Sequence, residues 1–277
     1  QVEKAQECLV KAHELDGSDP EIAKDIGNIF NASQNYQEAT KYYNLSLKIN
    51  SNYAPAINNL GLISKQQGNL QVAKQLVERA RDLDPTFVPF HLNLSSIYQE
   101  LGQLDQALAA TLKSLELKPD NAVAYMNLGG IYKDLGNFDQ AVVCLKEAMK
   151  SVKIKENAAV ALAKTYHFLG NYCEGIKVIS DINSKKSGNL LLSLYLCLDK
   201  KLEFNQCADY LISKRWLDSQ GIAAIDHANV IYNQILDNGL EGRNTIDSVS
   251  VQSINEQEFS DALIQEILIR LSSRLLQ

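Results

Sequence analysis

The sequence contains few of the residues that catalytic centres and disulfide frameworks require. It has only four histidines and five cysteines among 277 residues. No histidine lies in an H-x-D or H-x-E pattern, no two cysteines are spaced C-x-x-C, and the common nucleotide-binding, esterase and zinc-protease motifs are absent. The cysteines are odd in number and mostly share helical phases with apolar residues, which indicates buried thiols in a reducing compartment. We therefore expect no enzyme activity, cofactor or metal site within this chain.

Positive charge and long apolar runs are also lacking. The formal net charge is −6 and no cluster of Lys and Arg occurs, which argues against binding to nucleic acid or to an anionic membrane. No apolar run approaches the roughly 20 residues that span a bilayer, and the first residues do not resemble a secretory signal. Together with only five prolines, these features predict an ordered cytoplasmic protein with neither a nucleic-acid nor a membrane partner.

The chain does contain an internal repeat. Residues 88–121, VPFHLNLSSIYQELGQLDQALAATLKSLELKPDN, are restated from Ala122 onward, and further units begin at Pro20, Ala54 and Glu156. Equivalent residues of the two central units are thirty-four apart: Leu94 and Leu128, Tyr98 and Tyr132, Gly102 and Gly136, Asp105 and Asp139, Ala107 and Ala141. A period of this length predicts a stack of identical supersecondary units.

Small residues at two positions of the repeat suggest how each unit packs. The eighth and twentieth positions are small in nearly every unit, so two helices could approach closely there, with larger residues at the seventh, eleventh and twenty-fourth positions filling the gaps. Glycine at the fifteenth position should end the first helix in a left-handed conformation. These glycines are Gly68, Gly102, Gly136 and Gly170.

Proline at the thirty-second position should stop the second helix of a unit. Two units have it, at Pro85 and Pro119. The first and fourth units have Ser51 and Lys153 instead, and we expect looser turns there.

The period and this spacing of Leu, Gly, Tyr and Ala resemble the tetratricopeptide repeat (TPR) family, whose unit is a helix–turn–helix. The resemblance implies an all-α fold, a right-handed solenoid of antiparallel helix pairs, followed here by degenerate C-terminal helices. It also implies that the first helix of each pair lines a concave surface.

The repeat pattern divides the chain into five segments. We expect the second helix of a truncated repeat at 1–19, four to five units within 20–187 (20–53, 54–87, 88–121, 122–155 and 156–187), degenerate or capping helices at 188–238, a linker or loop at 239–253, and an amphipathic C-terminal helix at 254–277. The truncated first unit suggests that the natural protein continues upstream. The C-terminal helix is apolar enough to fold back, self-associate or dock on a further domain.

Asparagine recurs at the sixth position, where the resemblance implies a side chain directed into the concave groove: Asn59, Asn93 and Asn127. Asn costs about half a kcal/mol relative to Ala inside a helix, and its amide offers both a donor and an acceptor to an extended peptide backbone. The register resembles the asparagine ladder in the TPR arms of O-linked N-acetylglucosamine transferases. The alternative is an ordinary solvated helix face, because Asn is common at this position in TPR proteins.

A second resemblance concerns the two-carboxylate clamp of chaperone-binding TPR adaptors. Lys24, Asn28 and Asn59 match its first three positions, but Pro89 and Asn93 stand where its last two cations would be. Since a charge-assisted hydrogen bond contributes about 1.5–3 kcal/mol, an acidic C-terminal tail is disfavoured as the ligand. Four further groove candidates are Lys65, Gln99, Lys133 and Lys164.

Two functions follow from this reading. The first is a non-catalytic protein-interaction scaffold that holds an extended, weakly charged peptide or protein segment in its groove. The second is the substrate-recognition arm of a larger enzyme, of glycosyltransferase, sulfotransferase or 2-oxoglutarate oxygenase type, whose catalytic domain would lie outside this chain.

Overall fold

The computed structural model describes residues 17–182, 184–198 and 201–214. Residues 1–16 of the truncated repeat expected at 1–19 and residues 215–238 of the helices expected at 188–238 lie outside the described residues. So do the linker expected at 239–253 and the amphipathic helix expected at 254–277. The chain forms two compact units, Gln1–Ala158 and Ala159–Gln277, and the division falls inside a helix. Each unit is described by itself below.

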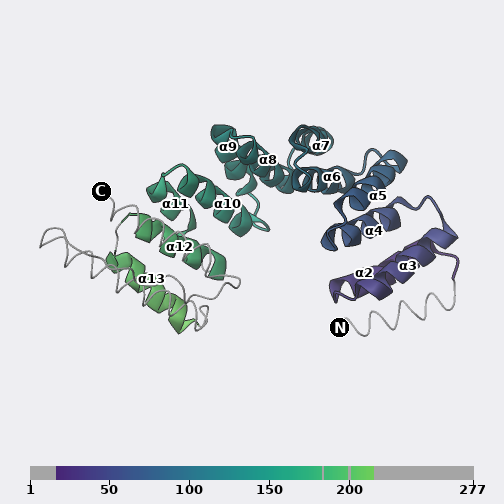
Figure 1. Cartoon of the computed structure of the whole chain (residues 1–277), viewed down its shortest axis with the longest axis horizontal. Helices are drawn as coiled ribbons and strands as arrows, with labels where there is room; N and C mark the ends of the chain where they lie inside the picture. Colours follow the sequence, from purple (N-terminus) through teal and green to yellow (C-terminus); the bar gives the residue numbers. More distant parts are fainter. Residues whose placement is uncertain (1–16, 183, 199–200, 215–277) are drawn as a thin grey trace, which may run out of the picture. The chain divides into compact units, whose positions relative to one another are not determined.

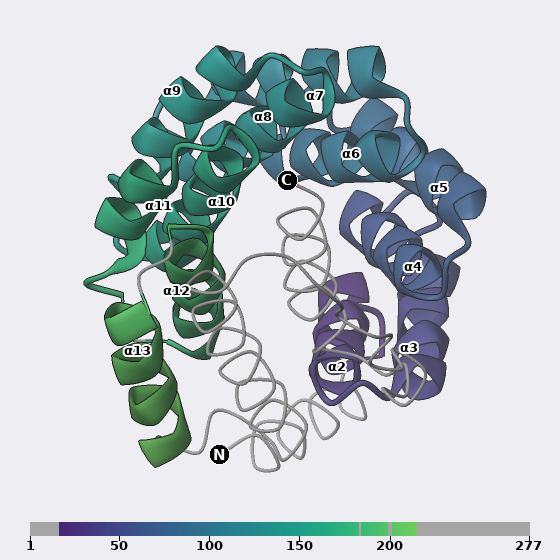
Figure 2. The same cartoon turned by 60° about the vertical axis from the view of Figure 1, so that its left-hand side comes forward.

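The first unit is built from helix pairs, and its described residues contain helices and no strands. Helices α2, α4, α6 and α8 are the first members of the pairs and follow one another along one side, with the second members along the other (Figures 1 and 2). The pairs are α2 (Pro20–Ala32) with α3 (Tyr36–Ile49), α4 (Ala54–Gln66) with α5 (Leu70–Leu83), α6 (Val88–Glu100) with α7 (Leu104–Leu117), and α8 (Ala122–Asp134) with α9 (Phe138–Ala148).

Close contact between the helices of a pair explains the small residue at the eighth position. A Cβ added to Gly61 would lie 2.6 Å from Cγ2 of Val77, the residue at the twenty-fourth position of the same unit. Gly129 meets Leu145 in the same way, also at 2.6 Å. Glycine is therefore required where the partner helix presents a large apolar side chain.

In the third repeat, residues 88–121, polar side chains occupy these two packing positions. Ser95 replaces the glycine and Thr111 replaces the large apolar residue, and their buried hydroxyls form a hydrogen bond. Thr111 also donates to the carbonyl of Ala107, at 2.8 Å. The paired exchange satisfies both hydroxyls, so the helices can pack closely without leaving a buried polar group unpaired.

The turns inside the pairs have the predicted left-handed residue. The backbone φ angles of Gly68, Gly102, Gly136 and Gly170 are 80°, 71°, 77° and 74°. In the first repeat, residues 20–53, Gln34 occupies this position with a φ of 60°. A side chain in this conformation is strained, since Cβ crowds the carbonyl oxygen that follows.

The turns between the pairs follow the prediction only in part. Helices α5 and α7 end two residues before Pro85 and Pro119. Helix α3 has the same 14 residues and ends at the equivalent Ile49, so the looser turn expected at Ser51 is wrong. The side chain of Asn50 accepts a hydrogen bond from the N–H of Asn52, at 3.0 Å, and Asp84 accepts the equivalent bond from Thr86, at 3.1 Å, in the turn that contains Pro85. The two turns are therefore closed in the same way. Helix α9 has only 11 residues, which agrees with the looser turn expected at Lys153 in the fourth repeat.

The second unit contains one short helix, α11, with eight residues. Its described helices are α10 (Lys155–Phe168), which begins in the first unit, α11 (Tyr172–Ile179), α12 (Lys185–Cys197) and α13 (Lys201–Ser213). These helices bury large apolar side chains: Leu162, Ile179, Leu194, Phe204 and Leu211. Not every described cysteine is buried as expected. Cys144 is buried, Cys207 is intermediate and Cys173 is exposed.

Candidate functional site

A continuous chain of side-chain hydrogen bonds crosses helices α2, α4 and α6. Asn93 on α6 donates to Asn58 on α4 at 2.8 Å, and Asn58 donates to its neighbour Asn59 at 3.1 Å. Asn59 in turn donates to Asn28 on α2 at 2.8 Å, and Asn28 donates to the carboxylate of Asp25 at 3.1 Å. We call these five residues the amide row. It joins three successive first helices of the first unit through polar contacts.

A tyrosine of α3 supports the amide row from behind. The Tyr43 hydroxyl donates to Oδ1 of Asn28 at 2.9 Å, and its side chain is fully buried. Burial raises the pKa of Tyr43 to about 12. The phenol therefore keeps its proton at neutral pH and remains a donor.

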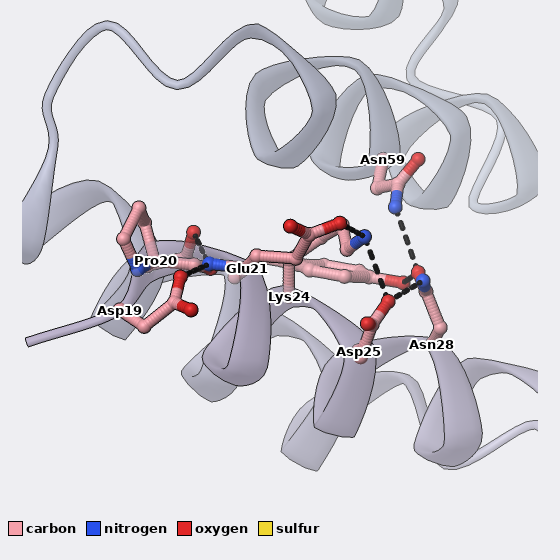
Figure 3. A network of polar contacts seen from close by, with 9 residues as sticks. Asp19, Pro20, Glu21, Lys24, Asp25, Asn28 and Asn59 are labelled. Atoms are coloured by element: carbon pink, nitrogen blue, oxygen red, sulfur yellow. Dashed lines mark hydrogen bonds and ion pairs between the residues drawn. The ribbon is translucent and has the colours of Figure 1, made fainter. Parts of the chain in front are cut away.

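Lys24, at the outer end of the amide row, is held by carboxylates of its own helix. Its Nζ lies 2.7 Å from Asp25 Oδ1 and 3.6 Å from Glu21 Oε1 (Figure 3). Burial alone would lower the pKa of Lys24, but the hydrogen bond and the charge of Asp25, with smaller contributions from Tyr53 and Glu21, raise it overall. Lys24 and Asn28 do lie close to Asn59, as in the chaperone-type clamp, but the lysine charge is already paired.

A second set of polar contacts joins α4, α6 and α8 near their C-terminal ends. Lys65 on α4 contacts Ser96 at 2.6 Å and Glu100 at 2.8 Å on α6. Gln99 on α6 donates to Asp134 on α8 at 2.5 Å, and Lys133 lies 3.4 Å from the same carboxylate. We call these six residues the charged row. Each of its charges has a partner of the opposite sign, so the row carries no net charge.

The nine predicted site residues therefore divide into four groups. Four belong to, or contact, the amide row: Lys24, Asn28, Asn59 and Asn93. Three belong to the charged row: Lys65, Gln99 and Lys133. Asn127 is half-buried on α8, and its side chain makes no hydrogen bond to any residue that the structure describes. Lys164 is exposed on the part of α10 that lies in the second unit.

The repeat register placed the asparagines on one face but did not predict the hydrogen bonds that connect them. The hydrogen-bonded pairs are thirty-one or thirty-five residues apart, as in Asn28 with Asn59 and Asn58 with Asn93, and not one full period apart. Both offsets describe the same face of the next helix, because they differ by one helical turn. A search for complementary polar residues at these two offsets would have paired Asn58 with Asn93 and Asp134 with Gln99. It would not have found Asp25, which lies three residues before Asn28 on the same helix.

Neither metal binding nor membrane insertion gains support from the described residues. Within 17–182, 184–198 and 201–214, no three His, Cys, Asp or Glu side chains gather as a potential metal site. In the same part of the chain, no helix combines the length and the apolarity that crossing a bilayer requires.

Comparison with known families identifies tetratricopeptide repeats in this chain. One "tetratricopeptide repeat" model matches residues 25–53 and 122–151, and another matches 65–113. A third, described as "TPR repeat", matches 95–136. The chain thus contains tetratricopeptide repeats, and the part that the structure describes is an all-helical solenoid of paired helices. No curated protein matches the sequence.

Solved structures with the same fold come from several bacteria. A tetratricopeptide repeat protein from Parabacteroides merdae has a TM-score of 0.62 and 15% identity, over 81% of this chain and 90% of that one. PilF of Pseudomonas aeruginosa has a TM-score of 0.61 and 14% identity, over 75% and 96%. YrrB, described as a TPR protein with an unusual peptide-binding site, has a TM-score of 0.51 and 19% identity, over 71% and 98%. Identities this low establish the fold alone.

Proposed function

We propose that this protein is an interaction scaffold that binds an extended, weakly charged segment of a partner protein on the first helices of its first unit. The amide row is the observation that carries the proposal. It orients asparagine side chains on three successive helices at a cost in helix propensity. Each amide has two donor hydrogens and two acceptor lone pairs, and the row uses only part of this capacity. The remainder suits the alternating N–H and C=O groups of a peptide backbone.

Charge pairing on this face favours a ligand without strong charge. Lys24 is paired with Asp25, Lys65 with Glu100, and Lys133 with Asp134. A charged ligand would have to compete with these internal pairs, whereas a neutral backbone would not. This is a second reason, beside the missing cations at Pro89 and Asn93, to disfavour an acidic tail. YrrB provides a precedent for peptide binding on the same fold. The resemblance to glycosyltransferase arms stays a prediction from sequence, and so does the compartment.

The experiment that tests the proposal compares two asparagines on different faces. A 12-residue peptide is first selected against the full chain from a random library, and its Kd is measured by titration calorimetry. Asn127→Ala removes a half-buried amide that has no partner among the described residues, so its loss should weaken binding about tenfold, the equivalent of one hydrogen bond.

Asn44→Ala is the matched control, because Asn44 is exposed on the second helix α3. It should leave the Kd unchanged. A selection without binders would contradict the proposal. Equal Kd values for the wild type and both variants would also contradict it.

A further inference from the structure

The hydrogen bonds of the amide row all point in one direction. Each asparagine of the row donates to the next residue toward α2, and the last donor, Asn28, meets Asp25. An ionised carboxylate only accepts hydrogen bonds, whereas an amide can present either end. Figure 3 shows this end of the row, with Asp25 between Lys24 and Asn28 and with Asn59 reaching across from α4.

Asp25 therefore determines the orientation of every other member of the row. Asn28 must direct Nδ2 to the carboxylate, so its Oδ1 is left to accept from Asn59 and Tyr43. Asn59 then has Oδ1 available for Asn58, and Asn58 has Oδ1 available for Asn93. The consequence reaches α6, where Asn93 keeps Nδ2 on Asn58 and leaves Oδ1 with no partner among the described residues.

We propose that Asp25 is a positioning residue that sets the hydrogen-bond polarity of the amide row, so that Asn93 presents an acceptor to a main-chain N–H of the bound segment. This inference rests on the proposed function and adds to it the main-chain group that Asn93 would meet. The acceptor of Asn93 lies at the end of the row that faces away from α2, and Asn127 follows one repeat later on α8. The acceptor therefore specifies which main-chain group of the ligand lies at this point, an N–H and not a C=O.

The polarity can be measured without any ligand. In the full-length, deuterated, ¹⁵N,¹³C-labelled protein, scalar coupling through a hydrogen bond connects the donor nitrogen with the acceptor carbon. We expect a correlation from Asn59 Nδ2 to Asn28 Cγ. Asp25→Asn replaces the acceptor-only group by one that can donate or accept, so this correlation should fall by at least half. The reverse correlation in the wild type, or an unchanged one in Asp25→Asn, would overturn the inference.

Glu21→Gln is the matched control. It removes the same charge from the same helix and from the same lysine, but Glu21 makes no contact with the amide row. The correlation should keep its wild-type intensity in this variant. Loss of the signal in both variants would assign the effect to charge rather than to polarity, and would overturn the inference.

Binding of the selected peptide provides the second measurement. If both polarities coexist in Asp25→Asn, only a fraction of the molecules is competent, and the Kd should rise two- to tenfold, while Glu21→Gln keeps the wild-type value. N-methylation of the peptide at the residue that faces Asn93 should weaken binding at least tenfold, and Asn93→Ala should abolish this difference. A peptide that is insensitive to Asn127→Ala contradicts the proposed function. A peptide sensitive to Asn127→Ala but insensitive to Asp25→Asn contradicts only the inference.

Discussion

The two compact units both consist of paired helices, but they differ in the polar side chains that the first helices of the pairs carry. In the first unit, α2, α4, α6 and α8 are joined by polar side chains through the amide row and the charged row. In the second unit, Ala161 occupies the sixth position of its repeat, where the earlier repeats have Asn59, Asn93 and Asn127. A hydrogen bond of 3.1 Å between His167 and Ser193 joins α10 with α12. The repeat period specifies helix pairs in both units, but a polar surface that could hold a backbone depends on residues outside the packing positions.

Packing between the paired helices gives the largest expected difference between the units. Gly61→Ala would place Cβ 2.6 Å from Val77 and 3.2 Å from the carbonyl of Ala73. The resulting strain exceeds the gain in helix propensity, so we expect the free energy of unfolding to fall by about 1–2 kcal/mol. Urea unfolding followed by circular dichroism measures the change. Adding Val77→Ala should recover part of the strain energy.

Gly175→Ala tests a glycine of the second unit, at the twentieth position of its repeat rather than the eighth. Its Cβ would lie 3.2 Å from two methyl carbons of Leu194, which can move, so stability should remain within about 0.5 kcal/mol of the wild type. Equal losses from Gly61→Ala and Gly175→Ala would show that the helices around Gly61 are not packed more tightly than those around Gly175.

The amide row should contribute to the stability of the first unit as well as to binding. Asn59→Ala removes the hydrogen bond that connects α4 with α2. It also removes the bond from Asn58 within α4, and so leaves Nδ2 of the largely buried Asn58 without an acceptor. We expect a loss of about 1 kcal/mol after the helix-propensity gain of about half a kcal/mol is included. The midpoint of urea unfolding reports it.

Asn127→Ala is the internal comparison for this prediction. It removes an amide without any described hydrogen bond, so it should be neutral or stabilise by about half a kcal/mol. If Asn59→Ala were equally neutral, the hydrogen bonds of the row would contribute nothing to the connection between repeats.

The smallest effect is expected at the turn inside the first pair. Gln34 has the φ of 60° that glycine adopts at the equivalent position of the later units. Gln34→Gly should stabilise the protein by about 0.5–1 kcal/mol, because relief of left-handed strain exceeds the added entropy of the unfolded chain. Gly68→Gln makes the opposite exchange and should destabilise by a similar amount. Differential scanning calorimetry should show shifts in Tm of opposite sign.

The fold could be predicted from the sequence because its packing positions are local and periodic. Gly68 marks a helix end and Pro85 a helix stop without reference to any other repeat, and the structure confirms both. The looser turn expected at Ser51 is wrong because the same kind of side-chain hydrogen bond closes both turns: Asn50 accepts it there, and Asp84 accepts it beside Pro85.

The candidate site could be predicted only in part. Register alone placed Asn59 and Asn93 on one face, but their contacts depend on partners at offsets of thirty-one and thirty-five residues. Whether an amide is engaged or available follows from these contacts and not from its position in the repeat. That distinction separates Asn59 from Asn127, which sequence reasoning treated as equivalent.

The central claim is that the first helices of the first unit, and not those of the second, bind the partner segment. It is tested most directly by adding the selected peptide to the labelled full chain and mapping the chemical-shift changes. We expect the side-chain amide signals of Asn93 and Asn127 to shift together with backbone signals of α6 and α8. The signals of Lys164 and α12 should keep their chemical shifts. Shifts confined to α10–α13, or to the second helices of the pairs, would contradict it.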